Sequence, residues 1–234
     1  MAAPTTPDPK GLHERLRMLS ARVLTIQEEE RRHISRDLHD DIGQSVTALK
    51  FALHRLAPLL GEEGAAGLSD CIGMADATLE RVRQLAHDMH PPQLDELGLE
   101  AALRGLVEGQ REATGLGIKC HFNGMLGRRF APAMETACYR ITQEALSNAT
   151  RHAEAASVLV AVEASAQALT LMIRDDGKGF DKRAVARRSQ RSSSLGLISM
   201  EERAKLAGGR LTVASQPGQG TIVRATFSTQ QGAA

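Results

Sequence analysis

A heptad seam of apolar residues near the start of the chain constrains its fold more than any other feature. Its first five members alternate at spacings of four and three, which indicates a helix whose apolar stripe pairs with a second helix in a coiled coil. The seam breaks at the polar run 27–33 and then resumes. Its two parts are Leu12, Leu16, Leu19, Val23 and Ile26, followed by Ile34, Leu38, Ile42, Leu49, Leu53, Leu56 and Leu60.

A second amphipathic helix is predicted after the first. Pro58 and the glycine-containing run 61–64 end the first helix, and a new apolar stripe covers residues 72–89 before it stops at the run 90–92. Two antiparallel amphipathic helices cannot bury both of their apolar faces alone, whereas two copies of such a hairpin can do so in a four-helix bundle. The periodicity therefore predicts an antiparallel helical hairpin that forms a dimeric four-helix bundle.

The second half of the chain has a different pattern, in which strands alternate with helices. We expect an α/β sandwich with helices over one mixed sheet. The expected helices are 94–113, 133–152 and 195–206, and the expected strands are 118–122, 157–163, 169–174, 210–215 and 221–227.

The composition limits the classes of function. The net charge is +1, and aromatic residues make up 3% of the chain, with no tryptophan. These values argue against a general nucleic-acid or anionic-membrane binder and against a base-stacking surface. We therefore expect no direct nucleic-acid partner.

Cysteine use and hydropathy indicate the compartment. Cys71, Cys120 and Cys138 show neither metal-ligand spacing nor a disulfide pattern, so each is expected to be a small buried residue. No apolar stretch reaches the length of a membrane span, and residues 1–11 do not form a signal peptide. We expect a cytoplasmic location, either for a whole protein or for the cytoplasmic part of a membrane-bound or larger receptor.

A histidine, an acid and an amide lie close together on the first helix. His39 is followed directly by Asp40, and Gln44 lies four residues beyond Asp40, so both polar side chains share a helical face. This arrangement suits a histidine that accepts a phosphoryl group and loses it again to an oriented water. His33 is a weaker candidate because it is expected to lack an acidic neighbour.

Polar residues and glycines in the α/β half suggest a nucleotide site. Glu144 and Asn148 share a helical face, and an Asn carbonyl oxygen is a hard ligand that suits Mg²⁺. Asp175 ends a predicted strand, and Gly177 and Gly179 would allow positive φ and a close approach of the backbone to a nucleotide. Taken singly, these residues could equally be a solvated helix face and a hairpin turn. No Walker-type sequence is present, which argues against a P-loop enzyme.

These motifs together resemble those of two-component sensor histidine kinases. The run 28–44 resembles the phosphoacceptor box, in the His-Asp-x-x-x-Gln form of the nitrate-sensor/DesK-like subfamily. The runs 143–153 and 175–180 resemble the N box and first glycine box of the GHKL ATPases. The run 195–203 resembles the second glycine box, where Ser194 stands in place of a glycine that the family often has.

The resemblance implies a domain plan and a fold. It implies a flexible tail over 1–11, a coiled-coil signalling helix over 12–33, a dimerisation and histidine-phosphotransfer domain over 34–92, and a catalytic ATP-binding domain over 93–230. The second of these domains would be the dimeric four-helix bundle, and the last a GHKL (Bergerat) α/β sandwich. The basic loop 180–194 would be a mobile lid over the triphosphate.

The resemblance also implies the substrate and the role of each site residue. ATP with Mg²⁺ would phosphorylate His39, with Asp40 holding the imidazole and Glu144 ordering water or helping to deprotonate the nucleophile. Asn148 would be the metal contact. The other nucleotide contacts would be His152, Asp175, Gly177, Gly179, Ser194, Gly196, Leu197 and Thr221.

The implied partners are a second copy of the chain and a response regulator. The phosphoryl group would pass to an aspartate of a regulator that usually carries a helix-turn-helix output domain, and Gln44 would support the reverse, dephosphorylating activity. Two alternatives stay open at this point. One is another GHKL enzyme, such as a serine-specific anti-sigma kinase or a chaperone-type ATPase, and the other is a degenerate kinase that acts as a scaffold.

Overall fold

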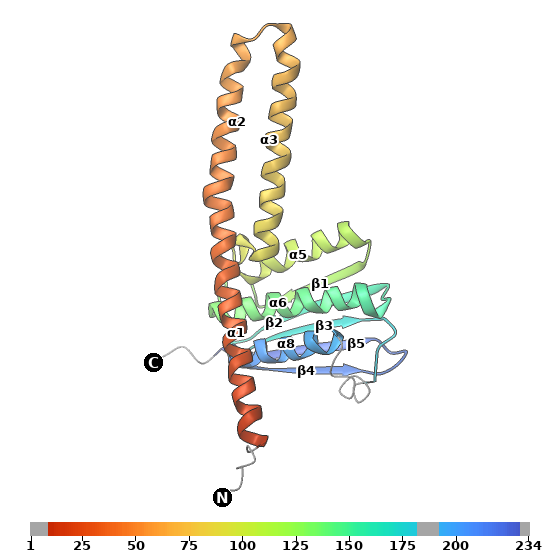
Figure 1. The fold of residues 1–234 in the computed structure, drawn as a ribbon. Helices are drawn as coiled ribbons and strands as arrows, with labels where there is room; N and C mark the ends of the chain where they lie inside the picture. The colour runs from red at the N-terminus through yellow and green to blue at the C-terminus, as the bar shows by residue number, and fades with distance from the viewer. Residues whose placement is uncertain (1–8, 182–191, 230–234) are drawn as a thin grey trace, which may run out of the picture. The chain divides into compact units, whose positions relative to one another are not determined.

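The structure of the chain is a computed structural model that describes residues 9–181 and 192–229 (Figure 1). Its contacts define two compact units. The first unit is Val23–Pro92, and the second groups Met1–Arg22 with Gln93–Ala234. The predicted order of a helical part followed by an α/β sheet domain is confirmed. None of the described helices has the length and apolar character needed to cross a membrane.

The helical part is a hairpin of long helices. Helix α1 (Pro9–Asp37) runs without a break through residues 27–33, although the apolar seam is interrupted there. It continues through a π-helical turn, η1 (Leu38–Gly43), into α2 (Gln44–Leu56) and a 3₁₀ turn, η2 (Ala57–Leu59). The chain then returns along α3 (Glu62–Met89).

The start of α3 differs from the prediction. The apolar stripe over residues 72–89 indicated a later start, but the helix begins at Glu62. Its first turns contain Gly64 and Gly67, which carry no apolar side chain and so give no periodic signal. Further along, Ala75, Val82 and Ala86 are buried.

The second unit contains a five-stranded mixed sheet in the order β1-β2-β3-β5-β4. Strand β1 pairs in parallel with β2, and every other neighbouring pair is antiparallel. The register places Val160, Ile173 and Val223 in one row across the sheet, and all three are buried. The strands are β1 (Gly117–Asn123), β2 (Ser157–Ala164), β3 (Ala168–Asp175), β4 (Gly209–Ser215) and β5 (Thr221–Ser228).

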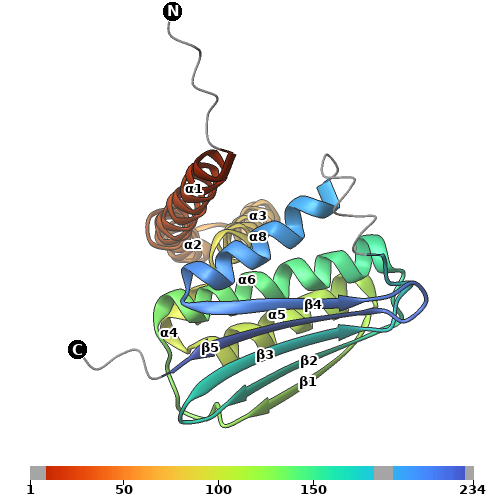
Figure 2. The ribbon, with the colours of Figure 1, turned by 90° about the horizontal axis from the view of Figure 1, so that it is seen from below.

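Three helices lie against one face of this sheet (Figure 2). They are α5 (Leu99–Thr114), α6 (Pro132–Asn148), which continues as the π-helical turn η3 (Ala149–Ala153), and α8 (Ser192–Leu206). The apolar residues of α5 recur at helical spacing and are buried, as are Tyr139 and Leu146 of α6 and Phe227 of β5. Each large side chain buried in this layer contributes about 1.5–3 kcal/mol to stability.

The predicted helix over residues 94–113 is wrong at its start. A short helix, α4 (Pro92–Glu96), ends before Gly98, and α5 begins at Leu99. Gly98 has a φ of +86°, and a Cβ atom there would lie 3.0 Å from the Arg129 side chain. Such a backbone conformation cannot continue an α-helix, so the chain turns at this residue.

The expectation that all three cysteines are buried is also wrong in part. Cys138 is buried in α6, and Cys120 is partly buried in β1, but Cys71 of α3 is exposed. Burial raises the pKa of the Cys138 thiol. Burial also raises the pKa of the Cys120 thiol, although the charges of nearby arginines partly offset this rise. Both of these thiols therefore stay protonated at neutral pH.

Candidate functional site

The first part of the candidate site lies on the helical hairpin, around His39. This residue lies in the π-helical turn η1, a wider turn than an α-helix that is frequent at functional sites. Its Nδ1 atom lies 3.2 Å from Oδ1 of Asp40, and both side chains are more than half exposed. The imidazole is thus open to solvent while one of its nitrogens is engaged by a carboxylate.

Two of the predicted residues, His39 and Gln44, line one groove of the hairpin. The groove has a volume of about 350 Å³ and lies between η1 and α2 on one side and α3 on the other. Asp40 is not among its lining residues, so it contacts the imidazole from beside the groove. The other lining residues are Gly43, Thr47, Ala48, Phe51, Leu79, Val82 and Arg83.

The structure corrects the expectation for His33. Its Nδ1 atom lies 3.4 Å from Oδ1 of Asp37, one helical turn further on, so this histidine does have an acidic neighbour. His33 differs from His39 in another way, because it lies in the regular helix α1 and outside the groove. The groove, and not the acidic partner, therefore distinguishes the two histidines.

The second part of the site is a cavity of about 240 Å³ in the α/β unit. It brings together six of the residues predicted to contact a nucleotide, from α6, η3, β3, the loop after β3, α8 and β5. These six residues are Asn148, His152, Asp175, Gly179, Leu197 and Thr221.

Several further residues line this cavity and were not singled out from the sequence. Lys178 and Phe180 lie within the predicted glycine box, and Ile173 and Val223 follow from strand alternation because they occupy inward-facing positions. The remaining lining residues are Ala145, Ala153 and Met200. The cavity wall is therefore mostly apolar, with the polar groups at a few positions.

Asp175 is fixed at the end of β3 by backbone groups. Its Oδ1 atom accepts hydrogen bonds from the N–H of Gly177 at 2.9 Å and from the N–H of Thr221 at 3.2 Å. Thr221 is also the register partner of Asp175 across β3 and β5. Both bonds end on Oδ1, so Oδ2 is the oxygen that can face a ligand in the cavity.

Glu144 and Asn148 are joined by a hydrogen bond along α6. The Nδ2 atom of Asn148 donates to Oε1 of Glu144 at 3.2 Å. The same Glu144 oxygen lies beside Gly196 of α8, where an added Cβ atom would overlap it. The N box and the second glycine box thus meet at this carboxylate, although neither Glu144 nor Gly196 lines the cavity.

The two glycines of the first box have different structural roles. Gly179 has a φ of +57°, as the sequence predicts, and a Cβ atom there would overlap the carbonyl oxygen of Gln216. Gly177 does not have a positive φ, so that part of the prediction is wrong. It is instead packed against Ala153 of η3, where a Cβ atom would overlap the carbonyl group.

Two neighbouring side chains anchor the loop that carries these glycines. The carboxylate of Asp176 accepts hydrogen bonds from the N–H of Ala156 and the N–H and hydroxyl of Ser157, at 2.8–2.9 Å. These bonds, those from Ser157 above all, hold the pKa of Asp176 below its usual value. Lys178 bonds Glu154 at 2.6 Å, which lowers the pKa of that carboxyl.

One predicted contact and the predicted lid lie outside what the structure describes. Ser194 belongs to helix α8, but its side chain is outside the described residues. The expected lid over residues 180–194 falls largely on 182–191, which are also outside them.

Both parts of the chain match known families. Residues 30–94 match the family described as histidine kinase, and residues 133–231 match the family of histidine kinase-, DNA gyrase B-, and HSP90-like ATPases. The fold and the matches thus define an ATPase domain of this superfamily that follows the helical hairpin of a histidine kinase. The chain belongs to the two-component sensor histidine kinases, in the nitrate-sensor/DesK-like subfamily.

Individual proteins agree with this assignment. The signal transduction histidine-protein kinase/phosphatase DegS of Brevibacillus brevis is 32% identical over 205 residues, which cover 86% of this chain and 52% of DegS. The oxygen sensor histidine kinase NreB of Staphylococcus carnosus (strain TM300) is 33% identical over 208 residues, which cover 88% of this chain and 58% of NreB. The chain therefore spans about half the length of these relatives.

A solved structure was also matched, the histidine kinase domain of the blue-light-activated histidine kinase from Erythrobacter litoralis EL346. It aligns with a TM-score of 0.48 and 20% identity, over 80% of this chain and 95% of that chain.

Proposed function

We propose that this chain phosphorylates His39 from ATP and passes the phosphoryl group to an aspartate of a response regulator. One observation carries the proposal: the chain holds both an exposed histidine bonded to a carboxylate and a cavity lined by Asn148, Asp175 and Thr221. Family membership supports the same activity. A degenerate kinase that acts only as a scaffold would need neither the exposed histidine with its carboxylate nor a cavity that binds ATP.

In the phosphorylation step, Nε2 of His39 attacks the γ-phosphorus. The bond from Nε2 to phosphorus forms as the bond to the β–γ bridging oxygen breaks, and ADP leaves. Asp40 accepts a hydrogen bond from Nδ1–H, which keeps the lone pair on Nε2 and stabilises the positive charge that develops on the ring.

The cavity residues hold the nucleotide. Oδ2 of Asp175 accepts a hydrogen bond from the adenine amino group, and the Thr221 hydroxyl lines the adenine pocket. His152 and Leu197 lie toward the phosphates, and the first turn of α8, which begins at Ser192, offers N–H groups that favour anions. Gly196 acts from outside the cavity, where it leaves room for the Glu144 carboxylate. The apolar wall from Ile173, Met200 and Val223 packs against the base.

The residues of α6 fit a magnesium ion. The Nδ2 atom of Asn148 is engaged by Glu144, which leaves the Oδ1 atom as a hard oxygen ligand. No group of three or more His, Cys, Asp or Glu side chains in the described part of the chain could hold a metal by itself, so Asn148 would hold Mg²⁺ together with the nucleotide. The ion, when bound, would neutralise charge on the triphosphate. Glu144 would order water beside Asn148.

A second, opposite activity is proposed for the hairpin. Gln44 lines the same groove as His39, and its amide can orient a water for attack on the acyl phosphate of the regulator. DegS is named as both a kinase and a phosphatase, which agrees with this proposal. The regulator is proposed to carry a helix-turn-helix output domain, and the reaction to take place in the cytoplasm.

Dimerisation is supported by apolar residues left uncovered on the hairpin. On α1, three exposed residues belong to the heptad seam, and on the remainder of the hairpin six large apolar side chains are between 45% and 68% exposed. Burying such a stripe against a second copy gives a coiled coil followed by a four-helix bundle. Light scattering of the purified chain should therefore give twice the mass of one chain. These nine residues are Leu19, Val23, Ile26, Ile42, Leu49, Phe51, Leu56, Met74 and Leu85.

Incubation with γ-labelled ATP and Mg²⁺ tests the kinase proposal. The parent should acquire an acid-labile, alkali-stable label, and His39→Gln and Asn148→Ala should not. His33→Gln is the matched control, because it removes an exposed histidine of α1 that also pairs with an aspartate. Label that persists in His39→Gln and disappears in His33→Gln would move the phosphoacceptor. A parent that binds no ATP would support the scaffold alternative.

A further inference from the structure

The last turn of α3 is fastened to α1 by a buried serine. Helix ends leave carbonyl groups without a donor of their own helix. The hydroxyl of Ser35, which is 2% exposed, lies 2.6 Å from the carbonyl oxygen of His90 and 2.9 Å from that of Ala86. The buried His90 imidazole also lies with Nδ1 3.5 Å from Oε1 of Glu28 on α1. The end of α3 and helix α1 should therefore move together.

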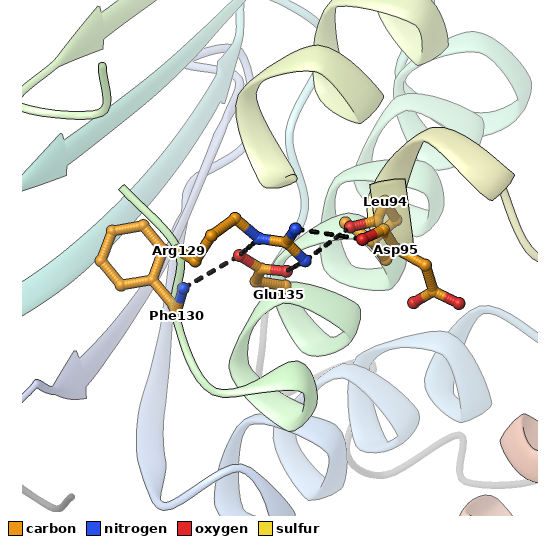
Figure 3. Close-up of polar contacts among 5 residues, drawn as sticks. All are labelled: Leu94, Asp95, Arg129, Phe130 and Glu135. Carbon is orange, nitrogen blue, oxygen red and sulfur yellow. Dashed lines mark hydrogen bonds and ion pairs between the residues drawn. The ribbon is translucent and has the colours of Figure 1, made fainter. Parts of the chain in front are cut away.

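Helix α4, which follows α3, is hydrogen-bonded to Arg129 of the α/β unit (Figure 3). Its Nη1 atom donates to the carbonyl oxygen of Asp95 at 3.0 Å, and Nη2 donates to that of Leu94 at 3.1 Å. One guanidinium thus satisfies two carbonyl groups near the end of α4, a fork geometry that a lysine cannot reproduce. The backbone of α4 is therefore joined to the loop that precedes α6.

Arg129 is itself held in place by a buried acid (Figure 3). Its Nε and Nη2 atoms donate to the two carboxylate oxygens of Glu135 at 3.1 and 3.0 Å, and the N–H of Phe130 adds a bond of 2.9 Å to Oε1. The Glu135 side chain is 2% exposed, and its hydrogen bonds raise the pKa of Arg129. This network orients the guanidinium toward α4.

Few residues lie between the hydrogen bond of Ser35 to His90 and the hydrogen bonds of Arg129 to α4. The carbonyl of His90 is bonded to Ser35, α4 begins at Pro92, and Pro91 lies in neither helix. The ring of a proline fixes its φ near −65°, so the prolines remove two of the remaining torsion angles. The division of the chain into two compact units also falls here, between Pro92 and Gln93.

We infer that Ser35 and Arg129 confine the hinge between the helical hairpin and the sheet domain to residues 90–92 and are positioning residues for phosphoryl transfer to His39. This inference rests on the proposed kinase function. Phosphoryl transfer needs in-line geometry, and a displacement of about 1 Å can cost roughly 100-fold in rate. A hinge with few free torsion angles limits the orientations that the ATP-binding unit explores and so increases productive encounters.

Amide hydrogen exchange tests the fastening without any activity measurement. The N–H groups of Leu97 and Gly98 bond to the carbonyl oxygen of Gln93 at 2.8 and 2.9 Å, and they report whether α4 stays folded. We expect Arg129→Gln to speed their exchange by roughly tenfold or more, with amides of the central strands unchanged. The matched control is Arg128→Gln.

Arg128 is a suitable control because it is the neighbouring arginine of the same loop. Its Nη2 atom donates to the carbonyl oxygen of Ser165 at 2.9 Å, and its guanidinium lies 5.3 Å from the ring centre of Phe130. These contacts involve neither α4 nor Gln93. Exchange at Leu97 and Gly98 should therefore be the same in Arg128→Gln as in the parent.

Autophosphorylation then tests the positioning role. At saturating ATP, Arg129→Gln and Ser35→Ala should each slow labelling of His39 by roughly tenfold, while the Kd for ATP stays within about twofold of the parent. Arg129→Lys is included because it keeps a cation beside buried Glu135 and should fold even if Arg129→Gln does not. Ser69→Ala, an exposed serine of α3, is the control for Ser35→Ala.

Each outcome decides one step. Unchanged exchange at Leu97 and Gly98 in both Arg129 variants would overturn the fastening, and faster exchange with an unchanged labelling rate would overturn the positioning role. A rise in the Kd for ATP that matches the loss of rate would show that Arg129 only supports the fold. A parent that fails to label His39 contradicts the kinase proposal instead, and the exchange data still decide whether the hinge is confined.

Discussion

Nδ1 of His39 lies 3.2 Å from Oδ1 of Asp40, the next residue in the π-helical turn. Because the two residues are neighbours in the sequence, the bond depends on no long-range contact and on no ligand. Both side chains are exposed, so the bond contributes little to the stability of the fold. Its consequence is orientation, since it selects the tautomer in which Nε2 carries the lone pair.

The variant Asp40→Asn should lose much of the labelling of His39. The amide removes the negative charge that stabilises the developing imidazolium, and we expect a fall of roughly 10- to 100-fold, less than the roughly 10⁴-fold known for a buried triad, because this pair is solvated. The Kd for ATP should not change. Initial rates of labelling measure the effect, and Asp41→Asn is the matched control. An equal loss in both variants would contradict a specific role for Asp40.

The variant Gln44→Ala should separate the two proposed activities. It removes the amide that faces the groove but leaves His39 and Asp40 in place, so labelling of His39 should stay within about twofold of the parent. Loss of phosphate from a phosphorylated regulator should slow by roughly tenfold or more. The matched control is Gln84→Ala, another exposed glutamine of the hairpin. Loss of phosphate at the parent rate in Gln44→Ala would contradict the proposal.

The variant Gly196→Ala should weaken nucleotide binding more than it weakens the fold. The added methyl group would overlap Oε1 of Glu144, so this flexible carboxylate has to move away and lose its hydrogen bond to Asn148, which the proposed Mg²⁺ site uses. The matched control is Gly105→Ala on α5, where an added Cβ atom meets nothing within 4 Å. That control should stabilise the fold by about 0.5–1 kcal/mol. Denaturant unfolding measures the stability of each variant, and ATP titration measures its affinity for the nucleotide. Equal effects of the two substitutions would rule out the clash.

The sequence predicts the regular elements well because their signals are local. Strand alternation and helical spacing identify each strand and the main helices of the α/β unit, and family matches confirm the overall class. The break at Gly98 is missed because a single glycine can lie within a helix, and only the structure shows that this one has a φ of +86°. The sequence does not predict the early start of α3 either, because small residues form a helix there without an apolar stripe.

The residues of the candidate site likewise divide into those that local motifs identify and those that only long-range contacts reveal. Asn148, Asp175 and Gly179 are found by short motifs, and the structure places all three in one cavity. The acidic neighbour of His33 could have been found as well, because Asp37 lies four residues further along a helix. Glu135 could not, because a single acid near the start of a helix looks like an ordinary solvated residue until its burial and its arginine partner are known.

The last prediction concerns Asp176 and acid stability. Its pKa is lowered by hydrogen bonds from Ser157 and Ala156, so ionised Asp176 favours the folded state. For a lowered pKa, this stabilisation is fully present above the ordinary carboxyl pKa of about 3.9 and is lost as the pH falls through the lower folded value. Asp176→Asn should therefore lower the Tm by a few degrees near neutral pH.

The pH dependence separates charge from packing. The difference in Tm between the parent and Asp176→Asn should shrink as the pH is lowered from about 7 to about 2, because both chains then carry a neutral side chain at this position. Thermal unfolding followed by circular dichroism measures the difference. Glu163→Gln, an exposed carboxylate of β2, is the control and should show no comparable gap at any pH. A gap for Asp176→Asn that stays constant into acid would mean that the shape of the side chain, and not its charge, anchors the loop.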